Sequence, residues 1–247
     1  MIRPSVSLSA LLVLLSAPMV FGSPFEFTGT AKDDRGNLLY LESHRVEGHC
    51  AEGVFQPITH SVDYRANQDS STFASKALRY EDGALRPTVD FSQPDYDEHL
   101  NISYQGPEQL KVQWQSPAGK TESHKVSFDD RLVVDAGFDH LVRANWNKVK
   151  QGESVEFRFL APTRGEHYGF VLEPTSNSQI GSDVVVRIRP TSLVLRFLVD
   201  PIVLGYNREG ALTEYLGLTN IRKNADDNYI AHIRYDVSRY PDCVLTP

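Results

Sequence analysis

The sequence predicts a mainly β protein: a curved antiparallel sheet or incomplete β-barrel with one helix packed on it. Three observations predict this fold: apolar residues that recur with a period of two, turn sequences between those runs, and one stretch with helical spacing. About ten to thirteen short strands are expected, and their close spacing favours antiparallel pairing because parallel neighbours need long crossover connections.

The runs with a period of two alternate apolar and polar side chains, as half-buried strands do. They occupy 100–104, 110–114, 154–160, 184–188 and 229–237. The intervening turn sequences include 33–37, 80–83, 105–108, 116–119 and 207–210. Each of these turns contains Gly, Pro, Asn or Asp, the residues that allow a hairpin to reverse.

Residues 135–150 break the period of two and predict an amphipathic helix. Asp135 can cap its N-terminus, the basic Lys148 and Lys150 suit its C-terminus, and Gly152 follows as a stop. We expect the helix to bury its apolar stripe on the concave face, or in one mouth, of the sheet. It separates two β halves, 24–134 and 154–240, that should form one continuous sheet. The stripe consists of Phe138, Leu141, Val142, Trp146 and Val149.

The N-terminal segment has the order of parts of a secretory signal peptide. Arg3 supplies a positive start, an uncharged apolar stretch runs from Leu8 to Phe21, and the small Gly22 follows. We therefore predict a signal peptide over 1–22 and a single β-rich domain over 23–247. The mature protein is expected in a periplasm or outside the cell.

The net charge of the chain makes some classes of binding partner less favourable than others. The chain has 25 basic and 32 acidic side chains; without Arg3 of the signal segment, 24 basic ones remain and the net charge is −8 with His neutral. This acidity disfavours nucleic acid and anionic lipid headgroups. No later apolar run reaches the roughly 18 residues of a membrane span, so none is predicted. The oligomeric state stays open.

Two cysteines, Cys50 and Cys243, lie near opposite ends of the mature chain. In an oxidising compartment they could pair and close a loop of about 190 residues, which stabilises by roughly 4–5 kcal/mol on the chain-entropy model. The alternative is one buried thiol and one in a frayed tail. Only their distance in the fold decides between these interpretations.

Two groups of polar residues are candidate metal sites. His44, His49, Cys50 and His60 offer ligands for zinc or copper. Their spacing matches no compact site, so surface or turn histidines are the favoured interpretation. The acidic group Asp95, Asp97, Glu98 and His99 could hold Ca²⁺ or serve acid–base chemistry, but it lacks the EF-hand spacing and favours a solvated loop. No metal and no cofactor is predicted.

One apolar run, 193–204, differs from its neighbours because it is apolar at nearly every position and carries only Arg196 and Asp200 as charges. It predicts either a central strand, apolar on both faces, or the wall of a hydrophobic ligand pocket. The residues that we expect to line such a pocket are Phe138, Leu141, Val142, Trp146, Leu195 and Phe197.

Two parts of the chain carry a resemblance to known exported proteins. The first comprises 27–32, Leu39-Tyr40, Glu42 and His44, and the second comprises 138–146, 155–159, Leu212, Tyr215, Gly217, Asn220, Ile221 and 233–235. With these residues the chain resembles an uncharacterised family of bacterial exported proteins over most of its mature length. The turn Tyr-x-Gly-x-Thr-Asn-Ile at 215–221 is also similar to exported domains that resemble the lipoprotein carrier and receptor proteins LolA and LolB. The resemblance implies a half-barrel and assigns no functional residue.

These observations favour a non-enzymatic exported protein that binds an apolar or amphipathic ligand, such as a hydrophobic small molecule or lipid, or assists envelope lipid traffic. The sequence contains no Gly-x-Ser-x-Gly elbow, HExxH pair or phosphate-binding glycine loop. Two alternatives stay open. One is a hydrolase or lyase acting on an envelope component through Glu42, His44 or Asp97, and the other is a structural or interaction protein of the envelope.

Overall fold

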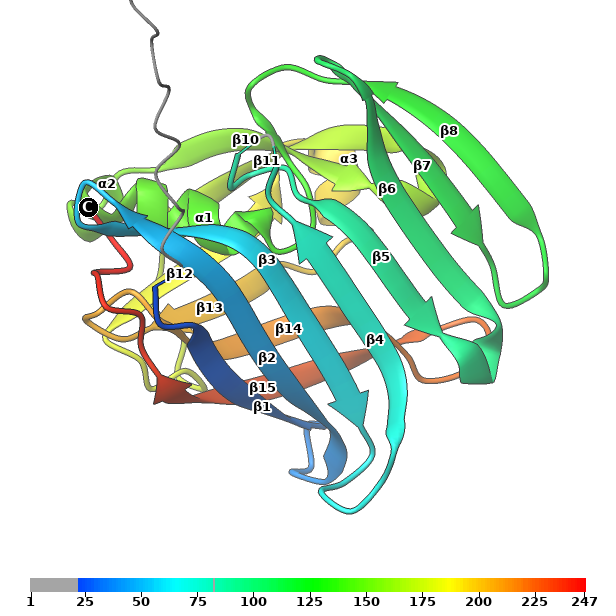
Figure 1. Cartoon of the computed structure of the whole chain (residues 1–247), viewed down its shortest axis with the longest axis horizontal. Coiled ribbons are helices and arrows are strands. Elements are labelled where there is room, and N and C mark those ends of the chain that lie inside the picture. The colour runs from blue at the N-terminus through cyan, green and yellow to red at the C-terminus, as the bar shows by residue number, and fades with distance from the viewer. Residues whose placement is uncertain (1–21, 82) are drawn as a thin grey trace, which may run out of the picture.

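The computed structural model describes residues 22–81 and 83–247, and all strands of this part belong to one sheet (Figure 1). The sheet is open and strongly curved, as the sequence predicts. Its fifteen described strands run in the order β8-β7-β6-β5-β4-β3-β2-β1-β15-β14-β13-β12-β11-β10-β9. Except for Gly22, the predicted signal peptide lies outside the described residues.

The first half of the sheet is an antiparallel meander in which each strand pairs with the next. Gly36 N donates to Asp33 O across 3.0 Å and closes the first predicted turn. The elements of this half are β1 (Phe25–Lys32), β2 (Leu38–Ala51), β3 (Val54–Arg65), β4 (Thr72–Arg79), β5 (Thr88–Gln93), η1 (Pro94–Tyr96), β6 (Glu98–Gly106), β7 (Gln109–Gln115) and β8 (Thr121–Ser127).

The second half is a second meander, joined to the first where β1 pairs with β15 and places Gly29 opposite Tyr235. The two halves therefore form the continuous sheet that the sequence predicts. The one parallel pair among the described strands joins β9 to β10. The strands of this half are β9 (Leu132–Val133), β10 (Val155–Ala161), β11 (Glu166–Pro174), β12 (Val184–Pro190), β13 (Ile202–Tyr206), β14 (Leu212–Arg222) and β15 (Asn228–Arg239), with η2 (Pro162–Arg164) between β10 and β11.

The predicted helix forms as two consecutive pieces, α1 (Gly137–Ala144) and α2 (Trp146–Lys150). Asn145 separates them, and its Nδ2 donates to Leu141 O across 2.9 Å, a bond that competes with the helical backbone. Gly152 has a φ of +86° and ends the segment as predicted. Asp135 does not cap the helix through its side chain: Ala136 is the N-cap residue, and the Asp135 carboxylate accepts from Ala136 N and from Lys76 Nζ.

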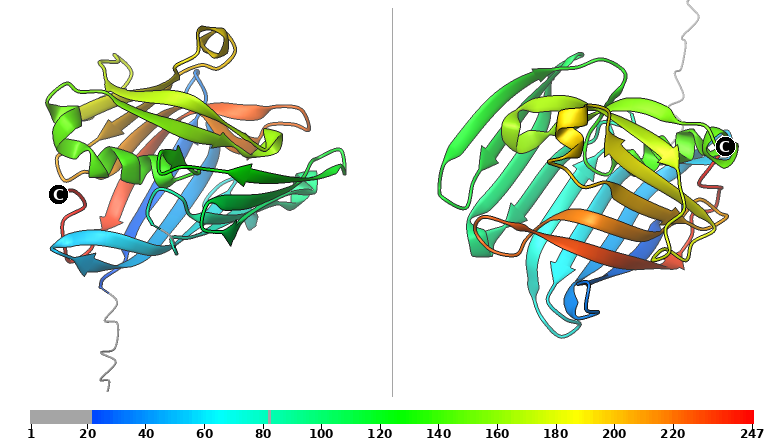
Figure 2. Two further views of the ribbon diagram at one scale, coloured as in Figure 1. Left: turned by 90° about the horizontal axis from the view of Figure 1, so that it is seen from above. Right: turned by 180° about the vertical axis from the view of Figure 1, so that it is seen from behind.

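The apolar stripe of the helix is buried against the second half of the sheet. Leu141, Val142, Trp146 and Val149 are all buried and share a core with side chains of β10 to β14, while Phe138 is partly buried beside them. Figures 1 and 2 show α1 and α2 inside the curve of the sheet. The helix thus fills the part of the concave space beside β10 to β14. This confirms the predicted packing.

The apolar run at 193–199 is not a strand, so that interpretation was wrong. It forms the short helix α3 (Leu193–Arg196) and a loop between β12 and β13. Pro190 and Pro201 bracket the run and lack the N–H group that a continuous β ladder needs. The segment also projects from the sheet: Leu193 is 70% exposed and Phe197 is 89% exposed. In Figure 2 α3 stands away from the helix pair inside the curve.

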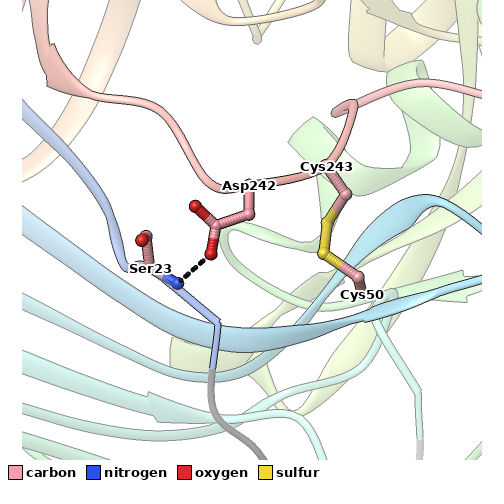
Figure 3. The surroundings of a disulfide bond; sticks show 4 residues. All are labelled: Ser23, Cys50, Asp242 and Cys243. Carbon is pink, nitrogen blue, oxygen red and sulfur yellow. Dashed lines mark hydrogen bonds between the residues drawn. A yellow bond between two sulfur atoms is a disulfide. The ribbon is translucent and has the colours of Figure 1, made fainter.

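Cys50 and Cys243 form a disulfide with a Cα–Cα distance of 5.9 Å, which decides between the two interpretations of the sequence (Figure 3). The bond attaches the C-terminal tail to the β2–β3 hairpin. Phe55 N donates to Val244 O across 2.8 Å on the same hairpin. Ser23 N donates to Asp242 Oδ2 across 3.0 Å, so the start of the described chain lies at the same place. No helix of the described residues is long and apolar enough to cross a membrane.

Candidate functional site

A buried polar cluster lies on the concave face of β2 and β3. Glu42 and His44 are two residues apart on β2, so their side chains share a face. His44 Nε2 lies 2.8 Å from Glu42 Oε2, and His44 Nδ1 lies 2.9 Å from His60 Nε2 on β3. The arrangement is a carboxylate followed by two imidazoles in a hydrogen-bonded row. Such a row fixes the orientation of both rings.

Aromatic rings enclose this row. Phe27 stacks on His44 with 4.3 Å between the ring centroids, and Tyr235 meets His44 edge-on at 5.6 Å. Glu42 is 5% exposed and His60 is 8% exposed. The row is therefore a part of the packed interior, with little surface available to a substrate.

Two further ion pairs lie in the interior between this row and the helix α1. Lys76 Nζ on β4 donates to both carboxylate oxygens of Asp135, each across 2.9 Å. Within α1, Arg143 Nη2 lies 2.8 Å from Asp139 Oδ2, and Arg143 Nε donates to Gly210 O across 2.9 Å. The Lys76–Asp135 pair holds the segment just before α1 to the first half of the sheet, and the bond to Gly210 joins α1 to the turn between β13 and β14.

Burial holds two histidines of this interior in the neutral form. It lowers the pKa of His60 well below the ordinary value, and the neighbouring His44 lowers it further. Burial, with a smaller contribution from Arg143, lowers the pKa of His140 on α1 to about 3. The His140 ring packs edge-on against Tyr80 at 5.1 Å. Neither imidazole can take a proton near neutral pH without losing its native surroundings.

The free energy of unfolding should consequently fall as the pH drops below about 6.5. Below this pH His60 and His140 are protonated in the unfolded chain but stay neutral in the folded protein. For His140, whose pKa in the fold is about 3, the loss should be roughly 2–3 kcal/mol between pH 6.5 and 4.5. His140→Phe keeps a ring against Tyr80 and should remove that share of the loss. Urea unfolding at pH 6.5 and 4.5 measures it. His99→Gln, at an exposed histidine, is the matched control. An unchanged pH dependence in His140→Phe would contradict this assignment.

The structure separates the four candidate metal ligands, and the interpretation of His44 and His60 as surface or turn histidines is wrong because both side chains lie in the packed interior. His44 and His60 lie together, but Cys50 is in the disulfide and cannot ligate as a thiolate. His49 does not join the hydrogen-bonded row of Glu42, His44 and His60. Among the described residues no group of three or more His, Cys, Asp or Glu side chains could hold a metal ion.

The acidic group at 95–99 is a solvated turn in part only. Asp95, Asp97 and His99 are exposed around η1, as predicted. Glu98 is buried, however, and lies 2.6 Å from Arg222 Nη2 and 2.9 Å from Trp114 Nε1. The solvated-loop interpretation was therefore wrong for Glu98, because β6 begins there and turns this side chain inward. Asp97 binds Gln115 through its backbone and does not join the row of Glu42 and His44.

The second candidate site is a groove of about 620 Å³ on the outer face of β12 to β15. Its floor comes from residues that alternate with the core: Val186 and Leu204 pack on the helix, so their neighbours Arg187 and Val203 point to the opposite face. The volume falls within the roughly 300–1,000 Å³ of small-molecule sites. The groove is lined by 175–177, Arg187, 198–201, Val203, 216–218 and Ile230.

The lining of this outer groove changes from polar to apolar across the sheet. Thr175, Ser176 and Asn177 follow β11, and Arg187 lies on β12. Strands β13 to β15 supply mainly aliphatic side chains, of which Leu218 and Ile230 are paired across β14 and β15 and more than half exposed. The loop after α3 adds Leu198, Val199 and Pro201 at the rim. The outer groove is thus amphipathic, with one polar and one apolar side.

The structure divides the six predicted pocket residues into two places. Leu141, Val142 and Trp146 are buried in the helix–sheet core with Phe138 beside them, whereas Leu195 and Phe197 lie on and just after α3. None of the six lines the outer groove, which takes Leu198 and Val199 from the same apolar run. Residues of the groove come from four strands and two loops, so no local sequence pattern could find them. The unusual apolar run was the one available signal.

Comparisons of the chain with models of protein families, with curated proteins and with solved structures gave no match.

Proposed function

We propose that this chain is an exported, non-enzymatic binding protein whose outer groove holds an amphipathic molecule with a single apolar chain, in the service of envelope lipid traffic. The outer groove is the observation that carries the proposal, since it combines an aliphatic floor with polar groups along one side. Export is supported by the disulfide, because such bonds persist in oxidising compartments.

The surroundings of the outer groove support an apolar ligand. Leu193, Val194, Phe197 and Leu198 on α3 and its loop are each at least 70% exposed. Exposed apolar patches of this kind are unfavourable in water and mark binding surfaces in soluble proteins. Leu198 belongs both to this patch and to the groove, so a chain lying in the groove would reach the patch. Burial of the ligand would remove apolar area of both from water.

The polar clusters favour binding over hydrolysis. In the row Glu42–His44–His60 all three side chains lie inside the packed interior. At a second place, on the outer face, Glu214 binds Ser182 Oγ at 3.0 Å and His232 Nε2 at 2.7 Å. A hydrolytic triad needs the imidazole between serine and carboxylate, whereas here the carboxylate lies between the other two.

A charge placed in the outer groove should weaken binding of an apolar ligand. Leu218→Glu puts a carboxylate against the apolar side, and we expect it to weaken binding of a fluorescent fatty-acid probe at least ten-fold, in line with about 1.5–3 kcal/mol for one buried leucine. The measurement is a fluorescence titration of the purified mature protein, accompanied by native mass spectrometry for co-purified lipid.

Leu38→Glu is the matched control, because Leu38 is an exposed strand leucine (45%, against 53% for Leu218) outside the groove. This variant should bind the probe like the unaltered protein. Equal binding by both variants, or a protein that binds no probe and carries no lipid, would overturn the proposed function.

A further inference from the structure

We infer that the ligand of the outer groove carries an anionic head, a carboxylate or a phosphate, which the guanidinium of Arg187 binds. This inference rests on the proposed function and deepens it. Among the described residues, Arg187 is the one basic side chain in the lining of the outer groove, and it lies on the polar side together with Thr175, Ser176 and Asn177. An anionic head at this point would let the apolar tail extend over β13 to β15.

Glu173 on the neighbouring strand fixes the orientation of the Arg187 side chain. Glu173 on β11 lies opposite Arg187 in the strand register, and its Oε1 accepts from Arg187 Nε across 3.0 Å and also from Nη2. Nη1 of Arg187 takes no part in the bonds with Glu173. A guanidinium carries five N–H donors in a rigid plane, so donors are left for a second anion. The Arg187 side chain is 40% exposed and can reach one.

Glu173 is shared between two arginines, which leaves positive charge beside the outer groove. Arg189 Nη2 donates to Glu173 Oε2 across 2.7 Å, and Arg189 Nε donates to Oε1 across 2.8 Å. The two guanidinium groups hold the pKa of Glu173 at about 2, with Arg189 the larger cause. One carboxylate therefore balances two guanidinium groups, and an anionic head would neutralise the second.

One further charge of the lining comes from the loop after α3. Asp200 lines the outer groove and is exposed, so it opposes an anion. Arg196 on α3 donates through Nε to Pro190 O across 2.9 Å and lies outside the lining. The charges of Arg187, Arg189, Glu173 and Asp200 sum to zero, so Asp200 takes the place of the anion until a ligand head binds. Asp200 gives the inference a second test, because its removal should act in the opposite direction to removal of Arg187.

The experiment compares heads on one tail. Dodecanoate, dodecyl phosphate and the uncharged monododecanoyl glycerol are titrated by calorimetry into the mature protein below their micellar concentrations. We expect Arg187→Gln to weaken binding of the anionic amphiphiles about ten-fold and to leave the glycerol ester within two-fold. Asp200→Asn should strengthen binding of the anionic amphiphiles alone. The relative affinities of dodecanoate and dodecyl phosphate decide which anion the site prefers.

Arg208→Gln is the matched control, since Arg208 also pairs with a carboxylate, Asp183, and lies outside the lining of the outer groove. It should leave all three affinities unchanged. Equal binding of charged and uncharged amphiphiles, unaltered in Arg187→Gln, would overturn the inference while the proposed function stands. Binding of none of the three would overturn both.

Discussion

Removal of the disulfide by Cys50→Ala together with Cys243→Ala is expected to lower the free energy of unfolding by about 4–5 kcal/mol. The physical reason is the length of the loop, since the cysteines are 193 residues apart in the sequence. A cross-link over so long a separation removes much of the conformational freedom of the unfolded chain. The fold itself should persist, because the two halves of the sheet are also joined by the pairing of β1 with β15.

The loss of stability should be largest around the C-terminal tail. Leu245 is buried with Phe25 and Phe55 in a small core beside the disulfide, and backbone bonds tie Val244 to the β2–β3 hairpin. Without the cross-link this core depends on those contacts alone. Urea unfolding of the double variant, compared with the unaltered protein with and without reductant, measures the effect. Reduction of the unaltered protein should reproduce the variant. A change below about 1 kcal/mol would show that the tail is held without the bond.

The sequence predicted the local elements well because their causes are local. Alternating apolar residues and Gly- or Asn-containing turns identified the hairpins, and the stripe from Leu141 to Val149 identified the helix. The sequence could not decide whether Cys50 and Cys243 are paired, because their distance is set by the fold. The outer groove could not be predicted from the sequence for the same reason. Arg187 and Ile230 line one groove only because strands β12 to β15 are neighbours in the sheet.

Two misinterpretations have a common physical cause. Apolar residues were assigned to the interior and charged ones to the surface, which holds on average but fails at particular sites. The apolar run at 193–199 is exposed, and Glu98 is buried with Arg222. The helix is another case in which charged residues are buried. Its amphipathic stripe predicts that the opposite face is exposed to solvent. Inside the curved sheet part of that second face is also covered, so Arg143 is buried and the Asp139 side chain is only 16% exposed.

The buried face of α1 leads to the second large expected effect. Arg143→Met should destabilise the protein by about 3–5 kcal/mol, because it leaves the carboxylate of Asp139, whose side chain is only 16% exposed, without its charge partner. The substitution also removes the bond from Arg143 Nε to Gly210 O. Arg131→Met is the matched control at an exposed pair with Asp129, and it should cost no more than about 1 kcal/mol.

The pH dependence separates a lost charge partner from lost packing. Burial already raises the pKa of Asp139, and Arg143 is the main influence that opposes the rise. Without Arg143 the folded protein should hold a proton on Asp139 to higher pH than the unfolded chain does. The added destabilisation should then be full at neutral pH and shrink as the pH falls toward the unfolded value near 4. Asp139→Asn combined with Arg143→Met should recover part of the loss at pH 7. If the cost of Arg143→Met is the same at pH 7 and pH 4, and the double variant recovers nothing, packing and the Gly210 bond carry the whole effect and the ion pair contributes none of it.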